Sequence, residues 1–358
     1  MRSPQAPNES GDEAAGSISP ARILIVKLTS VGDVLHALPA VSGIRRRFPE
    51  AHLAWLVDYR AADVVAMSRD VDEVIVLGEA ASHGDLGTPG AGEHLRALKQ
   101  VRAAGFDLVV DMQGLLKSAV FTYLSRARVR VGFGAARVGN RWATNVKLRP
   151  LQPRIHATAA YCRFAEALGA EATPDEFRIR VPEEGAQAAE RLFARAGEWG
   201  DASVAAIIPG SAWPSKRWPP EHFGELAARL VEERDMRILV LGHGGDRSAA
   251  EAIAGRCAGK ALSLAGETTL GEAIAVAARC RLVVGGDTGL VQIAAALRVP
   301  TVAIYGPTDP ALTGPVGPRV EVVQTRVDCW PCRERECEHW ECMRELGPGA
   351  VLKAAALV

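Results

Sequence analysis

The chain has 358 residues, of which 48% are hydrophobic and 23% charged, and its 42 basic and 42 acidic residues give a net charge of zero. This composition is ordinary for a globular protein, and the balanced charge does not favour nucleic acid as a partner. The length exceeds the size at which one hydrophobic core usually keeps growing, so it predicts two domains.

Residues 1–20 contain Asn, Ser, Gly, Glu and Asp without an apolar segment. They do not resemble a secretory signal, and we expect a disordered leader. No later apolar run approaches the ~18 residues that a membrane-spanning helix needs. These features predict a cytoplasmic protein whose cysteines stay reduced unless a metal holds them.

In the first half of the chain, short β-rich apolar runs alternate with helical patterns. Strands are expected at 23–26, 53–57, 74–77 and 108–111. The glycine-rich residues 78–92 predict a loop, and a helix is expected from His156 to about Leu168. The alternation indicates βαβ units around a parallel sheet.

The most informative stretch runs from Val26 to His36, at the end of the first expected strand. Ser30, Gly32 and Asp33 place backbone N–H groups and one carboxylate at the carboxyl end of that strand, where open α/β folds bind their ligands. Asp33 is therefore a candidate catalytic group. The alternative is that Asp33 only caps the next helix, a role in which Asp is favoured.

A basic stretch follows, in which eight cations occur without any Asp or Glu. They are Arg126, Arg128, Arg130, Arg137, Arg141, Lys147, Arg149 and Arg154. Such a stretch favours an anionic partner, for example a phosphorylated glycolipid or a membrane surface. The alternative is a solvated basic loop.

The second half repeats the α/β pattern, with strands expected at 204–208, 237–241, 282–284 and 301–304 and a short apolar helix at 351–358. We expect a first domain over 21–185 and a second over 186–358, with a ligand cleft between them. Nucleotide fingerprints do not fit, because Gly132 to Arg137 lacks the third glycine of G-x-G-x-x-G and no P-loop sequence occurs.

Three strand ends in the second half predict an anion site. Pro209, Gly210 and Ser211 follow a strand directly, and Lys216 to Glu221 opens a helix with proline in its first turn. Backbone N–H groups, a hydroxyl and a lysine at one strand end suit a diphosphate. The alternative for Lys216 is a surface lysine before a helix.

The next strand ends in a glycine pair followed by Asp287, Thr288 and Gly289. The glycines permit close approach of a ligand to the backbone, and Asp287 or Thr288 can cap the following helix. Tyr305 to Pro310 closes the third strand in the same style.

Four motifs give the chain, from about Arg22 onward, a resemblance to glycosyltransferase family 9, the bacterial heptosyltransferases of lipopolysaccharide assembly. They are Lys27 to Pro39, Asp111 to Ser118, Lys216 to Pro219, and Asp287 to Leu290 with Tyr305 to Pro310. The Asp-x-Gln-Gly-Leu-x-Lys-Ser form resembles the members that add the first heptose more than those that add the second.

The resemblance implies a GT-B fold, in which two Rossmann-like domains face each other across a cleft. It also implies an inverting transfer that needs no metal and no other cofactor for its chemistry. The donor would be ADP-L-glycero-D-manno-heptose and the acceptor a Kdo sugar on lipid A. We expect at most a peripheral, electrostatic association with the cytoplasmic face of the inner membrane.

By resemblance, Asp33 corresponds to the general base. Ser211 and Lys216 correspond to the donor phosphate site, and Asp287, Thr288 and Gly289 to the loop that holds the nucleotide sugar. We expect Lys117, with nearby arginines, to contact the carboxylates and phosphates of the acceptor, since arginine suits both groups through its bidentate geometry.

One departure from the family weakens the choice of donor. Relatives commonly have a histidine at the position of Gln292, and glutamine cannot carry a proton at neutral pH. Another nucleotide heptose or hexose is therefore an alternative donor, and a non-catalytic nucleotide-binding or scaffold protein is an alternative of a different class.

Four cysteines near the end of the chain, Cys329, Cys332, Cys337 and Cys342, fall within fourteen residues. They could hold a tetrahedral zinc ion, which we favour over an iron–sulfur cluster. The alternatives are free thiols and disulfides. The other three cysteines lie on apolar helical patterns and are expected in the core. They are Cys162, Cys257 and Cys280.

Overall fold

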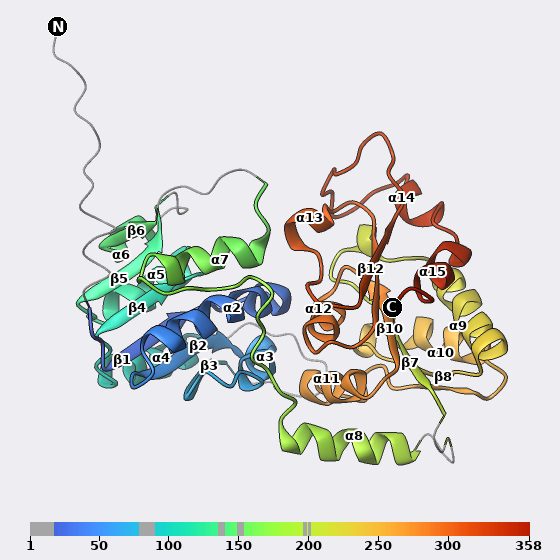
Figure 1. Cartoon of the computed structure of the whole chain (residues 1–358), viewed down its shortest axis with the longest axis horizontal. Helices are drawn as coiled ribbons and strands as arrows, with labels where there is room; N and C mark the ends of the chain where they lie inside the picture. Colours follow the sequence, from blue (N-terminus) through green and yellow to red (C-terminus); the bar gives the residue numbers. More distant parts are fainter. Residues whose placement is uncertain (1–17, 79–89, 135–139, 149–153, 196–198, 200–201) are drawn as a thin grey trace, which may run out of the picture. The chain divides into compact units, whose positions relative to one another are not determined.

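A computed structural model describes residues 18–78, 90–134, 140–148, 154–195, 199 and 202–358 (Figure 1). The described residues divide into two compact units, one up to Arg178 and one from Ile179 to Val358. Most of the expected leader and most of the expected loop at 78–92 lie outside the described residues. None of the helices in the described ranges combines the length and the apolar character needed to cross a membrane.

The first unit is built on a parallel six-stranded sheet of order β3-β2-β1-β4-β5-β6. Its strands are β1 (Arg22–Val26), β2 (His52–Asp58), β3 (Glu73–Leu77), β4 (Leu108–Asp111), β5 (Val129–Phe133) and β6 (Val146–Leu148). The order reverses between β1 and β4, whose Val26 and Asp111 are aligned partners. In open α/β sheets, ligands bind outside the carboxyl ends of the strands at such a switch point.

Helices cover both faces of this sheet. They are α2 (Val31–Arg47), α3 (Ala62–Ala66), α4 (Ala91–Ala103), α5 (Leu116–Leu124), α6 (Asn140–Ala143) and α7 (Ala157–Glu166), with a 3-10 turn at Tyr59–Ala61. Helices α4 and α5 bury Val101 and Phe121 against Leu24 and Val26 of β1. Helix α2 packs on α7, and Gly43 allows this, since a Cβ there would lie 2.6 Å from the Glu171 carbonyl oxygen.

The second unit has a parallel sheet of order β12-β11-β10-β7-β8-β9, which reverses between β7 and β10. Its strands are β7 (Val204–Ile208), β8 (Arg237–Val240), β9 (Ala261–Ser263), β10 (Leu282–Gly286), β11 (Thr301–Tyr305) and β12 (Val320–Gln324). The helices are α8 (Glu183–Arg195), α9 (Pro220–Arg234), α10 (Arg247–Gly255), α11 (Leu270–Ala278), α12 (Gly289–Ala296), α13 (Pro310–Thr313), α14 (Glu341–Arg344) and α15 (Pro348–Ala354). Two 3-10 turns lie at Pro214–Lys216 and Gly244–Asp246.

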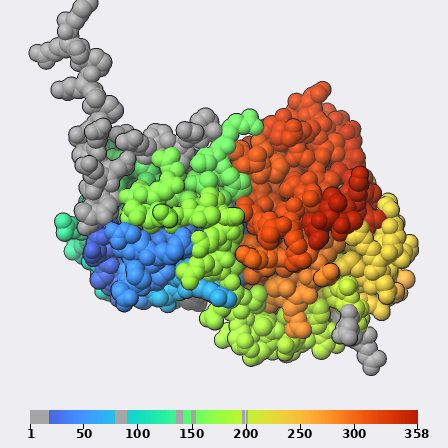
Figure 2. Space-filling view, in the orientation of Figure 1, coloured from blue at the N-terminus to red at the C-terminus, as the bar shows by residue number. Residues whose placement is uncertain are grey.

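Two hydrophobic clusters fill the second unit, one on each face of its sheet. Trp218, Phe223 and Leu352 belong to the cluster under α9, α10 and α15, while Leu192, Val276 and Tyr305 belong to the other. Figure 2 shows the red C-terminal segment seated beside the yellow α9, consistent with the packing of α15 on α9. The core is thus divided by the sheet into two layers.

The α/β class, the parallel sheets and the eight expected strands are confirmed, with ends that shift by a few residues. Four further strands, β5, β6, β9 and β12, were not expected, and their only buried residues are Val131 and Gly132 of β5 and Leu148 of β6. Helix α4 begins at Ala91, inside the expected loop. The last helix spans Pro348–Ala354 rather than 351–358, because a proline starts it.

Candidate active site

Asp287 is the centre of the most connected polar cluster at the carboxyl edge of the second sheet. It follows β10 and is 8% exposed. Its Oδ2 lies 2.6 Å from Nζ of Lys216 and accepts a hydrogen bond of 2.9 Å from the Thr308 hydroxyl. Its Oδ1 lies 3.2 Å from the hydroxyl oxygen of Tyr305. The carboxylate therefore joins the ends of three strands and is not used to cap α12.

Lys216 ends the 3-10 turn after β7, and its side chain is 15% exposed. The ammonium lies over the ring of Trp213, 4.2 Å from the ring centroid. Gly286 brings the β10 end close, because a Cβ at that position would be 3.1 Å from the Lys216 carbonyl oxygen. The lysine is thus held in one place by a carboxylate and an aromatic face.

Burial holds the Tyr305 side chain in its neutral form. Desolvation raises the pKa of Tyr305 well above its usual value, and the negative charge of Asp287 raises the pKa further. A neutral phenol keeps its proton as a hydrogen-bond donor, and the Thr313 carbonyl oxygen lies 3.1 Å from the same hydroxyl.

Gln292, one turn into α12, turns its amide toward the same carboxylate. Its Nε2 donates to the Thr313 carbonyl at 3.0 Å and lies 3.4 Å from Oδ1 of Asp287. Its Oε1 is buried and has no hydrogen-bond partner among the described residues. The glutamine therefore presents a neutral donor to Asp287.

Ser211, Thr288 and Gly289 surround this cluster. The Ser211 hydroxyl donates to the backbone carbonyl of Asp287 at 3.1 Å, so its proton ties two strand ends together. Thr288 is the residue before α12, and Gly289 is the first residue of that helix. All five residues expected at the donor site lie at this one edge of the second sheet.

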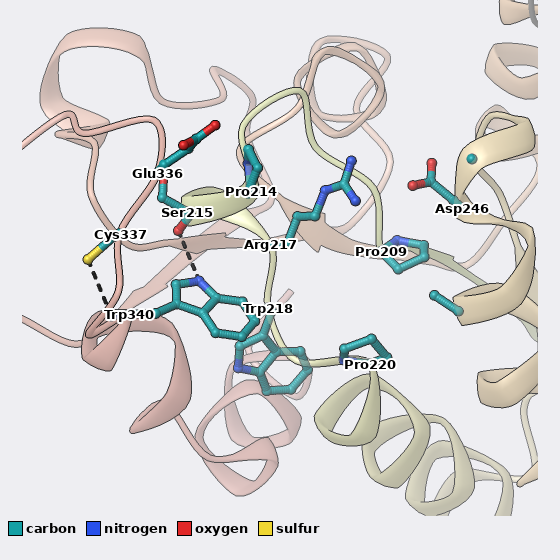
Figure 3. A pocket seen from close by; sticks show the side chains of 12 residues that line it. Pro209, Pro214, Ser215, Arg217, Trp218, Pro220, Asp246, Glu336, Cys337 and Trp340 are labelled. Atoms are coloured by element: carbon teal, nitrogen blue, oxygen red, sulfur yellow. Dashed lines mark hydrogen bonds between the residues drawn. The ribbon is translucent and has the colours of Figure 1, made fainter.

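A hollow of about 460 Å³ lies beside the Lys216 turn (Figure 3). Ser215, Arg217 and Trp218 line it, together with Asp246 and Trp340, but Lys216 and Asp287 do not. Consecutive residues of the turn thus face different ways, Lys216 toward Asp287 and its neighbours toward the hollow.

The Cys-rich segment, residues 329–342, is bound to both loops that hold the cluster. Ser215 donates through its hydroxyl to the Glu334 carbonyl at 2.6 Å. Trp340 donates through Nε1 to the Ser215 carbonyl at 3.2 Å (Figure 3). Trp330 donates to the carbonyl of Thr308 at 3.3 Å. The segment therefore holds Ser215, which precedes Lys216, and Thr308, which donates to Asp287, by hydrogen bonds.

All seven cysteines are free thiols. Within the described ranges, no three or more His, Cys, Asp or Glu side chains are grouped so that they could hold a metal ion. Burial, with the charges of the neighbouring thiols, raises the pKa of Cys342 to about 11. The three cysteines expected in the core, Cys162, Cys257 and Cys280, are buried.

In the first unit, Asp33 lies at the carboxyl end of β1, in the first turn of α2. Ser30 precedes the helix as its N-cap, and its backbone N–H and hydroxyl lie 3.3 and 3.2 Å from Oδ2 of Asp33. Asp33 is the third residue of the helix and not its N-cap, but its carboxylate accepts the Ser30 backbone N–H in a capping box and so takes part in capping α2. Its side chain is 43% exposed and can meet a ligand.

Lys27 is the nearest cation to Asp33, with Nζ 3.9 Å from Oδ2. The lysine is 3% exposed and lies against the ring of Tyr161, 5.3 Å from the ring centroid. Desolvation lowers the pKa of Lys27, and the charges of Asp33 and Asp111 oppose that shift. A buried cation thus stands behind a half-exposed carboxylate.

The Asp111 motif fixes the loop that carries Asp33. Gln113 Oε1 accepts hydrogen bonds from the N–H groups of Leu28 and Thr29, at 2.9 and 3.1 Å. Asp111 is fully buried and accepts from the N–H groups of Gln113 and Gly114. Burial raises the pKa of Asp111, and these hydrogen bonds oppose the shift. The two loops at the switch point are thus one hydrogen-bonded unit.

Lys117, the expected acceptor contact, lies at the start of α5. Its Nζ is 3.9 Å from Oδ2 of the buried Asp58, which Arg60 also contacts at 2.7 and 2.9 Å. In the basic stretch, Arg126, Arg128, Lys147 and Arg154 are exposed, whereas Arg130 donates to the carbonyls of Ala127 and Ala143. Arg137, Arg149 and the side chain of Arg141 lie outside the described residues.

The structure therefore gathers the expected donor residues at one sheet edge, and Asp33 at the corresponding edge of the other unit. The partners Lys27, Gln113, Tyr305 and Thr308 were not predicted individually, although all four fall inside the motifs quoted from the sequence. Their position inside those motifs was the only sign in the sequence that they belong to the site, because the spacing of residues along the chain does not show which side chains are in contact.

Comparison with known proteins gives consistent matches. A sequence model of glycosyltransferase family 9 (heptosyltransferase) matches residues 94–342. The chain is 32% identical to lipopolysaccharide heptosyltransferase 1 of Pseudomonas aeruginosa, over 89% of this chain and 88% of that protein. It resembles the structure of Escherichia coli heptosyltransferase WaaC with ADP, with a TM-score of 0.73, 26% identity, and coverage of 93% of this chain and 98% of that one.

A glycosyl transferase family 9 structure from Veillonella parvula also matches the fold, with a TM-score of 0.80. It is 22% identical and covers 94% of this chain and 96% of its own. The two parallel six-stranded sheets thus match the fold of solved heptosyltransferases, which confirms the expected GT-B class.

Proposed function

The chain belongs to glycosyltransferase family 9, and on that premise we propose that it transfers heptose from ADP-L-glycero-D-manno-heptose to a Kdo–lipid A type acceptor in lipopolysaccharide core biosynthesis. The observation that carries the proposal is the Asp287 cluster, in which Lys216 is held at a sheet switch point within a family 9 chain. A nucleotide diphosphate is the ligand that such an edge favours.

The acceptor side of the reaction is assigned to Asp33. As the acceptor oxygen attacks the anomeric carbon, its proton passes to the Asp33 carboxylate, which acts as general base. Its half-exposed position at the end of β1 supports this role. The buried ammonium of Lys27 lies 3.9 Å behind this carboxylate.

The donor side is assigned to Lys216 and the backbone N–H groups at the start of α12. As the bond between the anomeric carbon and the phosphate oxygen breaks, its electron pair passes to the departing ADP, and these groups stabilise the negative charge. Attack and departure on opposite faces invert the anomeric centre. In this proposal, Asp33 accepts the proton and Lys216 stabilises the departing ADP, and neither step requires a metal.

The acceptor carries carboxylates and phosphates, for which Lys117 and Arg60 supply cations beside the Asp111 motif. The proposed setting is the cytoplasm, at the inner membrane surface where a lipid-linked acceptor would lie. Lipopolysaccharide heptosyltransferase 1 of Pseudomonas aeruginosa, at 32% identity, supports by its name a heptose transfer in lipopolysaccharide synthesis.

The test is ADP release from ADP-heptose, with and without the Kdo–lipid A acceptor, for the native protein, Asp33→Asn and a matched control. Glu50→Gln changes an exposed carboxylate of the same unit and serves as that control. We expect Asp33→Asn to lower acceptor-dependent release by about 10²–10⁴-fold, with ADP binding unchanged and the control native. Near-native release by Asp33→Asn would remove Asp33 as the base.

Gln292 supports a second candidate, a transferase of the same fold that uses another nucleotide sugar. The neutral amide beside Asp287 replaces a group that can carry charge in relatives, which alters the donor loop. If ADP binds but ADP-heptose releases no ADP, a panel of nucleotide sugars decides between this candidate and a protein that only binds nucleotide.

A further inference from the structure

Helix α5 carries a row of apolar side chains on its exposed face. Phe121 and Thr122 are buried, whereas Leu116, Val120 and Tyr123 are 63%, 44% and 60% exposed. These three positions follow the i, i+4, i+7 spacing of one helix face. A surface helix usually presents polar side chains on the face away from the core, so an exposed apolar row is typical of a contact surface.

The exposed apolar surface extends to the neighbouring helices, since α4 and α6 both contact α5. Leu95 on α4 is 52% exposed, Leu115 is 37% exposed and Trp142 on α6 is 80% exposed. With Leu116, Val120 and Tyr123 they form what we call the α5 surface. It contains six of the nine large hydrophobic residues that are exposed in the described part of the chain. Single exposed apolar residues are ordinary, but a group of them marks a contact site.

A hollow of about 300 Å³ opens in the α5 surface between α4 and α5. The apolar side chains of Leu95, Leu98, Val120 and Phe121 line it, together with those of His94 and Lys117. The surface therefore has a recess for apolar groups with a cation beside it.

Cations flank the α5 surface. Arg96 and Lys99 are exposed on α4, and Arg126 and Arg128 are exposed just after α5. Asp111, the acid nearest α5 in sequence, is fully buried and hydrogen-bonded. Apolar side chains bordered by arginine and lysine match the boundary between the acyl region and the head groups of an anionic bilayer.

We propose that the α5 surface docks the first unit on an anionic lipid bilayer, with Leu116, Tyr123 and Trp142 entering the interface. This inference deepens the proposed function and rests on it. If the acceptor is linked to a lipid, docking would bring the bilayer that holds it to the surface that carries Lys117. Docking by apolar side chains differs from the purely electrostatic association expected from the sequence, since salt screens only the contribution of the cations.

The test is co-sedimentation of the full chain with phosphatidylethanolamine vesicles that contain or lack phosphatidylglycerol, at low and high ionic strength. The variant is Leu116→Gln/Tyr123→Gln, and the control is Val322→Gln/Leu357→Gln, which alters two exposed apolar residues of the second unit. We expect native binding that prefers the anionic vesicles and survives in part at high salt. The variant should bind about tenfold or more weakly, and the control should match the native protein.

Unchanged vesicle binding by Leu116→Gln/Tyr123→Gln would overturn the proposal, as would native binding that high salt abolishes. Self-association of the native chain in light scattering, lost in the same variant, would overturn it in favour of a second copy of the chain on this surface.

Transfer assays separate this inference from the proposed function. With a deacylated, soluble acceptor, Leu116→Gln/Tyr123→Gln should match the native rate, and with an acceptor embedded in vesicles it should be slower. If the native protein transfers to neither acceptor, the proposed function fails, while vesicle binding still decides whether the α5 surface docks on lipid.

Discussion

The ammonium nitrogen of Lys216 lies 2.6 Å from Oδ2 of Asp287, and both side chains are largely withdrawn from water. The pair links the loop after β7 to the loop after β10, the two strands at which the sheet order reverses. A diphosphate that binds Lys216 therefore shares this cation with Asp287, which holds the ammonium in position before the ligand arrives. Such prior positioning reduces the cost of ordering the side chain on binding.

Lys216→Met should weaken ADP binding by about tenfold or more, because a charge-assisted hydrogen bond contributes about 1.5–3 kcal/mol. It should also lower the free energy of unfolding by about 1–3 kcal/mol, since the carboxylate of Asp287 loses its cation. Calorimetric titration with ADP and urea denaturation measure the two effects.

The double variant Lys216→Met/Asp287→Asn separates the two effects. It should recover part of the lost unfolding free energy, since no unpaired carboxylate is left, but not the ADP affinity. Lys353→Met, at an exposed lysine of the same unit, is the control. Native ADP affinity in Lys216→Met would show that Lys216 does not contact the phosphates.

Gln113→Leu should lower turnover while leaving ADP affinity unchanged. The substitution removes the acceptor for the N–H groups of Leu28 and Thr29, which lead into the Asp33 helix. Two unpaired N–H groups let this loop move and should cost about 1–3 kcal/mol of unfolding free energy. Steady-state kinetics and urea denaturation test both expectations, with Gln113→Glu, which keeps the acceptor oxygens, as the conservative comparison. Equal turnover in native and Gln113→Leu proteins would mean that Gln113 does not position Asp33.

The strands that matter for the site were predictable from the sequence because they are buried apolar runs that end in small or polar residues. β1 before Asp33 and β7 before Ser211 are both of this kind. In contrast, β6 and β9 have three residues each, at the ends of their sheets, and such short runs give no periodic signal. These two short edge strands were therefore missed, while the longer buried strands that lead into the site were found.

Within the site, the sequence predicted which residues gather but not how they pair. Asp287 was expected to hold the donor or to cap α12, and its bonds to Lys216, Thr308 and Tyr305 depend on three strand ends meeting. Ser30 is the N-cap of α2, and Asp33, three residues later, accepts a hydrogen bond from the Ser30 backbone N–H. Contacts between side chains far apart in sequence follow from the sheet order, which no local pattern contains.

The buried Lys27 should make stability depend on pH. Burial lowers the pKa of Lys27 below its usual value of 10.5, and unfolding restores the usual value. Between those two pKa values the unfolded chain binds more protons than the folded chain, so the free energy of unfolding rises with pH across that window. Lys27→Met removes the titrating group and should flatten this rise.

Urea denaturation of native and Lys27→Met proteins at neutral pH and near the usual lysine pKa of about 10.4 measures the difference in slope. Lys99→Met, at an exposed lysine of the same unit, should keep the native slope. Identical slopes for native and Lys27→Met proteins would show that Lys27 has the same proton affinity in the folded and unfolded chains.

Ser215→Ala/Trp340→Phe should weaken ADP binding although neither residue lines the Asp287 cluster. The double variant removes the hydroxyl that donates to Glu334 and the indole N–H that donates to Ser215. Each lost hydrogen bond costs about 0.5–1.5 kcal/mol, and the loss loosens the turn that ends in Lys216. Because Lys216 must hold its place to bind a phosphate, we expect ADP affinity to fall while the acceptor side of the reaction is unaffected.

Trp142→Phe, an exposed tryptophan of the other unit, is the matched control for ADP titration. If the Cys-rich segment positions Lys216, the effects of Ser215→Ala/Trp340→Phe and Lys216→Met on ADP affinity should not add, because both act through the same ammonium. Full additivity, or an unchanged ADP affinity in the double variant, would mean that the segment stabilises the second unit without positioning its lysine.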